Sequence, residues 1–179
     1  TRFFEYDVER VAETFRLIRV RQPDARLLVV GQGLEPTAEA RFYDSIEQKG
    51  LTPFVTRSGW IAEDELPGYF AAADVALYPF DDTLINRTRC PVKLTDLLYA
   101  GVPVVADAVG EIVAYIRHRE TGLLVPARTP QAMAEAALEL LQDTCLAQRL
   151  SAQGAQAMRT RYAWSTRADQ LQKIYVHLL

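Results

Sequence analysis

Apolar and polar residues alternate along the chain with two different periods. A recurrence every three to four positions, the spacing of one face of an α-helix, predicts helices over 7–22, 36–49, 63–73, 91–100, 111–118, 130–143 and 145–178, the last one broken near 163–164. Short apolar runs predict strands over 25–31, 53–60, 74–80, 102–106 and 121–126. Predicted helices and predicted strands therefore alternate along most of the chain.

Strands that alternate with helices indicate an α/β fold. We expect a Rossmann-like, doubly wound parallel sheet with helices on both faces and a helix-rich C-terminus. Ligands bind to such sheets outside the carboxyl ends of the strands, where the strand order reverses. A doubly wound domain opens with a strand, whereas "TRFFEYD" (1–7) leads almost directly into the first predicted helix. We therefore expect a strand, and a further domain, to precede Thr1 in the parent protein.

Composition and charge argue against several classes of function. Of the 179 residues, 49% are hydrophobic, which is enough for one sizeable core. The net charge of −3 argues against a general nucleic-acid-binding protein. No apolar run is as long as a membrane span, and Cys90 and Cys145 do not have the spacing of metal ligands. We expect a protein of the reducing cytoplasm that binds no metal.

The stretch "NRTRCPVKLTDLLYAGVPVVAD" (86–107) begins with polar and basic residues. The predicted helix and the predicted strand follow directly after them. Pro91 suits the first turn of a helix, where its missing N–H has no cost. The N–H groups of Val92, Lys93 and Leu94 would then point out of the helix start. By geometry and by dipole, such a helix start is a site for an anion.

Several side chains near this helix start have two interpretations. Three cations surround it, namely Arg87, Arg89 and Lys93. Asp96, roughly opposite the leucine stripe of the helix, can accept from the hydroxyl pair of a sugar, or it is a surface carboxylate on an amphipathic helix. Gly31 and Gly33 follow a predicted strand, where they let the backbone approach a nucleotide or serve only the turn.

Five segments, in order, resemble one family. They are "PDARLLVVGQG" (23–33), "SGWIAEDELPGYFAAADVALYPF" (58–80), "PVKLTDLLYAGVPVVAD" (91–107), "TGLLVP" (121–126) and "RYAWSTRADQLQKIY" (161–175). These segments are similar to the retaining glycosyltransferases with two Rossmann-like domains, the GT-B fold, of group 1 or family 4. The resemblance implies that 1–179 is a single Rossmann-like, nucleotide-sugar-binding domain, the C-terminal half of a larger two-domain enzyme.

The resemblance also implies roles for charged residues. Thr88 and Asp96 stand where the family often has two glutamates in its donor site, so the first carboxylate is absent and the second has a shorter reach. Arg2 corresponds to an arginine in a loop that approaches the donor diphosphate. Lys93, Arg87 or Arg89 would supply a second positive charge, and Arg2 and Lys93 are expected to be catalytic.

Further donor-site positions follow from the same resemblance. Trp60 and Ile61 stand after a strand, where the family's backbone reads the base. Gly110-Glu111 resembles a pair at a helix start near the donor. The other positions expected to bind the donor are Gly31, Gly33, Pro91, Val92 and Leu94.

The implied activity is the transfer of a sugar from a UDP-, GDP- or ADP-sugar to an acceptor hydroxyl, with retention of the anomeric configuration. No cofactor is implied beyond this donor substrate. The acceptor, a glycan or glycolipid, and a peripheral membrane contact would involve the missing N-terminal half, so this part alone is expected to be inactive. Two alternatives are half of a nucleotide-sugar epimerase and a non-catalytic nucleotide- or partner-binding module with a degenerate donor site.

Overall fold

The computed structural model describes residues 8–33 and 35–178. In chain order the elements, with η marking 3-10 helices, are α1 (Val8–Arg21), β1 (Leu27–Val29), α2 (Pro36–Gln48), η2 (Thr52–Phe54), β2 (Val55–Arg57), η3 (Glu63–Glu65), α3 (Leu66–Ala71), β3 (Ala76–Tyr78), α4 (Leu84–Thr88), α5 (Val92–Tyr99), β4 (Val104–Asp107), α6 (Ile112–Tyr115), β5 (Leu123–Val125), α7 (Pro130–Gln142), α8 (Thr144–Thr160) and α9 (Trp164–Leu178). Each predicted helix and strand has a counterpart, although the strands are shorter than predicted.

Two segments differ in kind from the prediction. The predicted strand over 53–60 begins as the turn η2, where Pro53 fixes the backbone, before β2 starts. The short helix α4 replaces a predicted loop. Its N-cap is Thr83, whose hydroxyl accepts a hydrogen bond from the Asn86 N–H at 3.2 Å. This cap is a helix-start signal that apolar periodicity does not reveal.

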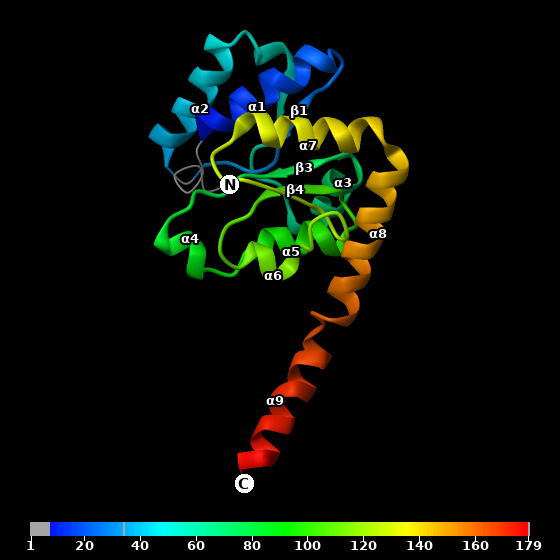
Figure 1. Ribbon diagram of the computed structural model, residues 1–179. Coiled ribbons are helices and arrows are strands. Elements are labelled where there is room, and N and C mark those ends of the chain that lie inside the picture. The colour runs from blue at the N-terminus through cyan, green and yellow to red at the C-terminus, as the bar shows by residue number, and fades with distance from the viewer. Residues whose placement is uncertain (1–7, 34, 179) are drawn as a thin grey trace.

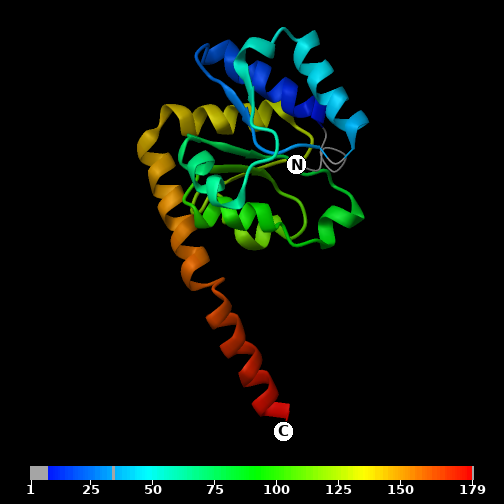
Figure 2. The ribbon, with the colours of Figure 1, turned by 180° about the vertical axis from the view of Figure 1, so that it is seen from behind.

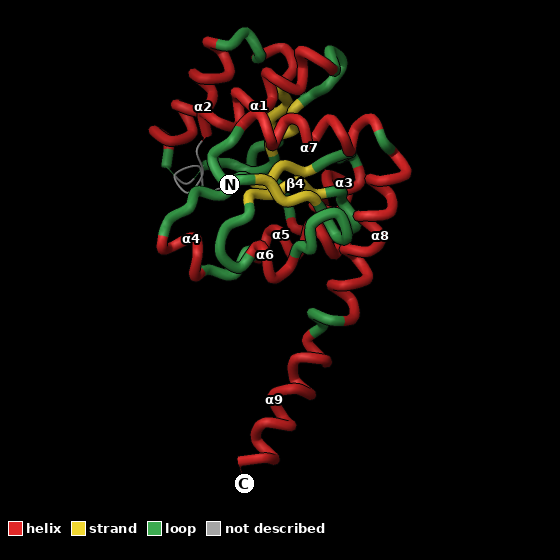
Figure 3. The backbone as a smooth tube through the Cα atoms, in the orientation of Figure 1, coloured by secondary structure: helices red, strands yellow, loops and turns green. Residues whose placement is uncertain are grey.

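All pairings between the named strands are parallel, as predicted. Within the described residues these strands form two sheets, β1–β2 and β3–β4–β5, rather than one continuous sheet. The strands lie in the middle of the molecule, between layers of helix (Figure 3). The parallel strand direction and the layering of the predicted doubly wound sheet are therefore confirmed. The sheet is interrupted between β1 and β3, which do not pair with each other within the described residues.

Helices cover both faces of the strands (Figure 1). On one face, Ile18 of α1 packs with Val105 of β4 and Met133 of α7. On the other face, Leu94 and Leu98 of α5 pack with β3, β4 and α6. A third cluster joins α1, β1 and α2. Three contiguous apolar clusters thus confirm the α/β fold with helices on both faces.

The two C-terminal helices differ in how they contact the rest of the domain. The helix α8 packs against α5, whereas α9 projects away from the strands (Figure 2). Trp164, the first residue of α9, is 90% exposed, because α9 leaves the body of the domain at this residue. Among the described residues, no helix is long and apolar enough to cross a membrane.

Candidate functional site

The loops that follow the parallel strands meet at one edge of the molecule, where the fold class predicts a ligand site. Gly31 after β1 and Gly59 after β2 form an isolated backbone bridge. The N–H of Phe80, just after β3, donates to the carboxylate of Asp107 at the end of β4 at 2.7 Å. The strand ends are therefore connected in pairs within each sheet.

The two candidate glycines after β1 are in different situations. Gly31 has a φ of 95°, and its N–H donates to the Ser58 hydroxyl at 3.1 Å. The N–H of Gly33 donates to the carboxylate of Glu39 at 3.0 Å. A phosphate at the Gly33 amide would have to displace this carboxylate, which occupies the position that an anion would take.

The start of α5 differs from the prediction. Pro91 is the N-cap residue, with a ψ of 67°, and lies just outside the first turn. The N–H of Val92 donates to the Cys90 carbonyl at 3.0 Å, and that of Leu94 donates to the Pro91 carbonyl at 2.9 Å. The prediction that these two amides point outward was therefore wrong, because the turn at Pro91 closes back on the chain.

The polar side chains between β3 and α5 have partners within the chain. The hydroxyl of Thr88 donates to carbonyls of its own helix α4 at 3.1 and 3.2 Å. Arg87 forms an exposed ion pair with Asp82, with 2.5 Å between Nε and Oδ1. The guanidinium of Arg89 lies 5.3 Å from the centre of the Phe80 ring. Of the three predicted cations, Arg87 is thus held by an acidic neighbour.

A cavity of about 900 Å³ brings together five of the predicted donor-site residues. These are Gly31, Trp60, Ile61, Lys93 and Asp96. The other described candidates, Gly33, Thr88, Pro91, Val92 and Leu94, are not among its lining residues. Arg2 lies outside the described residues, so its predicted role remains a prediction. The sequence therefore identified residues after β1, after β2 and on α5 that line one cavity.

Two lining side chains suit a nucleotide. Trp60 lines the cavity and is 68% exposed, so part of its aromatic side chain is accessible. Partial burial raises the pKa of the Asp96 carboxyl above its ordinary value of 3.8. An ionised carboxylate has two acceptor oxygens, which suit it to bind sugar hydroxyl groups.

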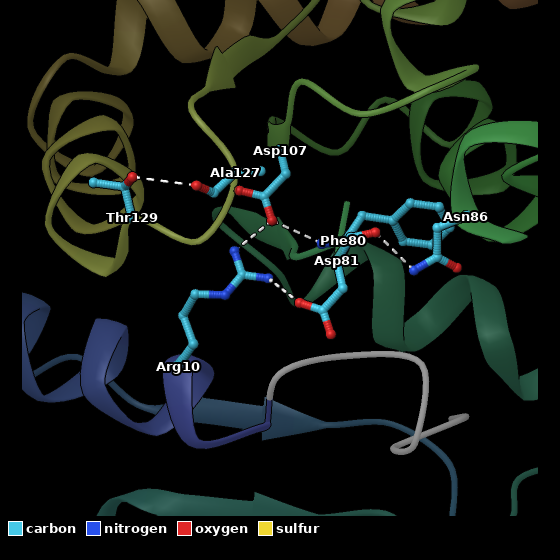
Figure 4. A network of polar contacts seen from close by, with 7 residues as sticks. All are labelled: Arg10, Phe80, Asp81, Asn86, Asp107, Ala127 and Thr129. Atoms are coloured by element: carbon cyan, nitrogen blue, oxygen red, sulfur yellow. Dashed lines mark hydrogen bonds and ion pairs between the residues drawn. The ribbon is translucent and has the colours of Figure 1, made fainter. Parts of the chain in front are cut away.

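The sequence reasoning missed a buried polar network at the same strand ends (Figure 4). The guanidinium of Arg10, near the start of α1, pairs with the carboxylate of Asp107 and donates to Asp81 at 3.3 Å. The Asn86 amide donates to the Asp81 carbonyl at 2.9 Å. This network anchors α1 and α4 to the ends of β3 and β4.

Burial dominates the electrostatics of Asp107, which is completely inaccessible. It raises the pKa of this carboxyl above 3.8, while the Phe80 N–H and the Arg10 guanidinium act in the opposite direction. One sequence signal could have found this residue. A charged residue that directly follows a buried apolar strand requires a partner, although nothing local in the sequence points to Arg10.

A family model described as "Glycosyl transferases group 1" matches residues 2–143. The chain is 34% identical over 164 residues to the GDP-mannose-dependent alpha-(1-6)-phosphatidylinositol monomannoside mannosyltransferase of Mycobacterium tuberculosis, covering 86% of this chain and 40% of that protein. It is 32% identical to the phosphatidyl-myo-inositol mannosyltransferase of Mycobacterium leprae, covering 85% of this chain and 38% of that one. The chain thus spans about two fifths of these curated relatives.

Solved structures give the same fold. Sucrose-phosphate synthase from Thermosynechococcus elongatus matches with a TM-score of 0.78 at 26% identity, over 99% of this chain and 44% of that one. Anabaena HepE, solved in complex with UDP and glucose, matches with a TM-score of 0.76 at 20% identity, over 91% and 44%. Because the family model covers most of its length and the M. tuberculosis relative exceeds 30% identity, the chain belongs to the group 1 glycosyl transferases of the GT-B fold.

Proposed function

We propose that this chain is the donor-binding half of a glycosyltransferase that moves a sugar from a nucleoside-diphosphate sugar to an acceptor hydroxyl with retention. Membership in the group 1 glycosyl transferases supports the reaction class. The observation that carries the proposal is that Gly31, Trp60, Lys93 and Asp96 all line one cavity. A backbone approach, an aromatic face, a cation and a carboxylate are the groups that a nucleotide sugar requires.

Lys93 has the role of stabilising the leaving group. When the bond between the anomeric carbon and the diphosphate oxygen breaks, negative charge grows on the departing nucleoside diphosphate. Lys93 lies in the first turn of α5, so its ammonium adds to the positive end of the helix dipole. Arg2, which precedes the described residues, is proposed as the second cation.

Asp96 and Trp60 would hold the nucleoside. Asp96 lies one turn further along α5 than Lys93, so its carboxylate would accept from hydroxyl groups of the ribose while the lysine contacts the diphosphate. The exposed Trp60 indole and the Ile61 backbone would hold the base. Glu111, at the N-cap of α6, is proposed to lie near the donor sugar.

The relatives suggest the class of donor rather than one base. The M. tuberculosis relative is named as dependent on GDP-mannose, and HepE was solved with UDP and glucose. We therefore extend the proposal to nucleoside-diphosphate sugars as a class. The acceptor would bind to the remaining part of the full-length protein, so the 179-residue chain alone would bind nucleotide without transferring sugar.

One observation favours a second candidate, a nucleotide-binding module with a degenerate donor site. Thr88 stands at a position where the family that the sequence resembles often has a glutamate. Its hydroxyl donates to carbonyls of α4. No carboxylate from this position is therefore available to a donor sugar. Nucleotide binding would persist in such a module, while transfer would not.

Two measurements separate these candidates. Calorimetric titration of the chain with UDP, GDP and ADP should show binding tighter than millimolar, about −4 kcal/mol or stronger. Full-length protein incubated with labelled donors and acceptor extracts should release nucleoside diphosphate and a product of retained configuration. Nucleotide binding without transfer would favour the second candidate, and free 2-epimerised sugar would favour an epimerase. Absence of both binding and transfer would overturn the proposal.

A further inference from the structure

A second, smaller cavity of about 240 Å³ lies between the end of α6, the turn that follows this helix and the last turns of α8. None of the residues that line it also lines the larger cavity of the candidate donor site. Pockets for drug-sized ligands have volumes of roughly 300–1,000 Å³. The small cavity is therefore a separate site with room for a ligand of about one ring.

Two tyrosines that line this cavity lie against each other. The ring centres of Tyr115 and Tyr162 are 4.9 Å apart, with an angle of 37° between the ring planes. The Tyr162 hydroxyl donates a hydrogen bond to the Ala114 carbonyl, which ties this residue to α6. Both tyrosines are half-buried. They therefore offer the cavity a fixed, partly accessible aromatic surface, against which the C–H groups of a ligand can pack.

The polar side chains around the tyrosines have unused hydrogen-bonding groups. The Thr121 hydroxyl accepts from the Arg117 N–H at 2.9 Å, but no described residue accepts its proton, although Thr121 is only 8% exposed. The side-chain amides of Gln153 and Gln156 make no hydrogen bond within the part of the chain that the structure describes. Each amide offers two donors and one acceptor. These groups suit a ligand that carries several hydroxyl groups.

The charges around the cavity favour an uncharged ligand. Arg117 and Arg161 both line it, but Arg117 is paired with Glu120, with 3.5 Å between Nη1 and Oε2. The helix α8 ends at Thr160, so the negative end of its dipole lies beside Arg161. A phosphate would meet the Glu120 carboxylate and this helix end together with the two cations. A neutral ligand avoids both repulsions.

We propose that this cavity is a second sugar-binding site, which holds one neutral pyranose ring. The C–H groups of the ring pack against Tyr115 and Tyr162, and its hydroxyl groups bind to Gln153, Gln156 and Thr121. A purely apolar ligand would instead remove these polar groups from water without giving them partners. The site goes beyond the proposed donor site, because it would hold a sugar unit of a glycan away from the reacting atoms.

Nuclear magnetic resonance of the full-length protein, labelled with ¹⁵N-glutamine, tests the proposal. The probes are glucose, mannose, galactose and N-acetylglucosamine, each added in the presence of excess UDP and GDP, which keep these sugars out of the donor site. At least one sugar should shift the side-chain amide signals of Gln153 and Gln156 with a millimolar dissociation constant, while the signal of Gln148, elsewhere on α8, stays unchanged. Absence of a shift at about 100 mM of every sugar, where a millimolar site would be saturated, would overturn the proposal.

Two alanine variants on α8 form a matched pair, because Gln156 and Gln148 are both exposed and only Gln156 lines the cavity. Alanine is favourable in a helix, so both variants should fold. Gln156→Ala should weaken sugar binding by about three- to tenfold, followed on the Gln153 signal, and Gln148→Ala should leave it unchanged. Nucleoside-diphosphate binding should be equal in both variants, so the sugar site and the donor site are tested separately. Equal sugar affinities of the two variants, or inorganic phosphate that shifts the same signals at lower concentrations than any sugar, would overturn the proposal.

Discussion

Arg10 and Asp107, 97 positions apart in the sequence, form an ion pair in which both side chains are buried. The pair joins the start of α1 to the end of β4, and Asp81 accepts a further hydrogen bond from the same guanidinium. Buried charges are tolerated only when they are paired and hydrogen-bonded. The pair therefore anchors the start of α1 to the carboxyl ends of β3 and β4.

Replacing Arg10 with methionine should destabilise the fold strongly. Arg10→Met keeps most of the side-chain volume but leaves the Asp107 carboxylate buried without a cation, which should lower the free energy of unfolding by about 3 kcal/mol. The matched control is Arg16→Met on the same helix, whose pair with Glu13 is partly exposed and should contribute less than about 1 kcal/mol. Urea denaturation measures both. Equal losses would mean that the buried pair has no special role.

The raised pKa of Asp107 predicts a pH dependence of stability. Since the folded-state pKa lies above 3.8, the folded chain keeps a proton between these two values that the unfolded chain has lost. Stability from this group is therefore highest below 3.8 and falls as the pH rises through the folded-state pKa. Asp107→Asn cannot ionise, so its free energy of unfolding relative to the wild type should increase over this window. Urea denaturation at several pH values measures this difference. If the midpoints of the two proteins changed in parallel with pH, the prediction would be contradicted.

Local patterns were sufficient to predict the elements, because apolar periodicity reflects which side of a segment is buried. The helix α4 was not predicted, because "LINRT" (84–88) has no apolar stripe and depends on the Thr83 cap. The exposure of Trp164 was not predictable, because sequence periodicity does not distinguish a packed helix from one that projects from the domain.

The candidate site was predictable where it depends on strand ends and one helix. Gly31, Trp60, Lys93 and Asp96 come from three such positions and line one cavity. The features that could not be predicted depend on contacts between residues far apart in the sequence or on a single backbone dihedral angle. Arg10 finds Asp107 across most of the chain, and the ψ of Pro91 decides that the Val92 amide turns inward.

The loop after β4 leaves no room at Gly110. A Cβ atom at this position would lie 2.4 Å from the Arg87 Cα, so Gly110→Ala must displace α4. Gly101→Ala is the matched control, since both glycines have a positive φ but nothing lies within 4 Å of a Cβ at Gly101. The control should cost about 1–2 kcal/mol for the left-handed backbone alone. Gly110→Ala should cost about 1–3 kcal/mol more, measured by urea denaturation, and similar losses would show that α4 adjusts freely.

The charge of Lys93 should matter more for binding than the charge of Asp96. A diphosphate carries more negative charge to the start of α5 than ribose hydroxyls carry to Asp96, so Lys93→Ala should weaken nucleoside-diphosphate binding by about 10- to 100-fold. Asp96→Asn should weaken nucleoside-monophosphate binding by less, because an amide oxygen still accepts from a hydroxyl. Lys173→Ala, at an exposed position of α9, controls for a general loss of positive charge and should leave affinity unchanged. Calorimetry that shows equal losses for the Lys93 and Asp96 variants would place the diphosphate away from the α5 start.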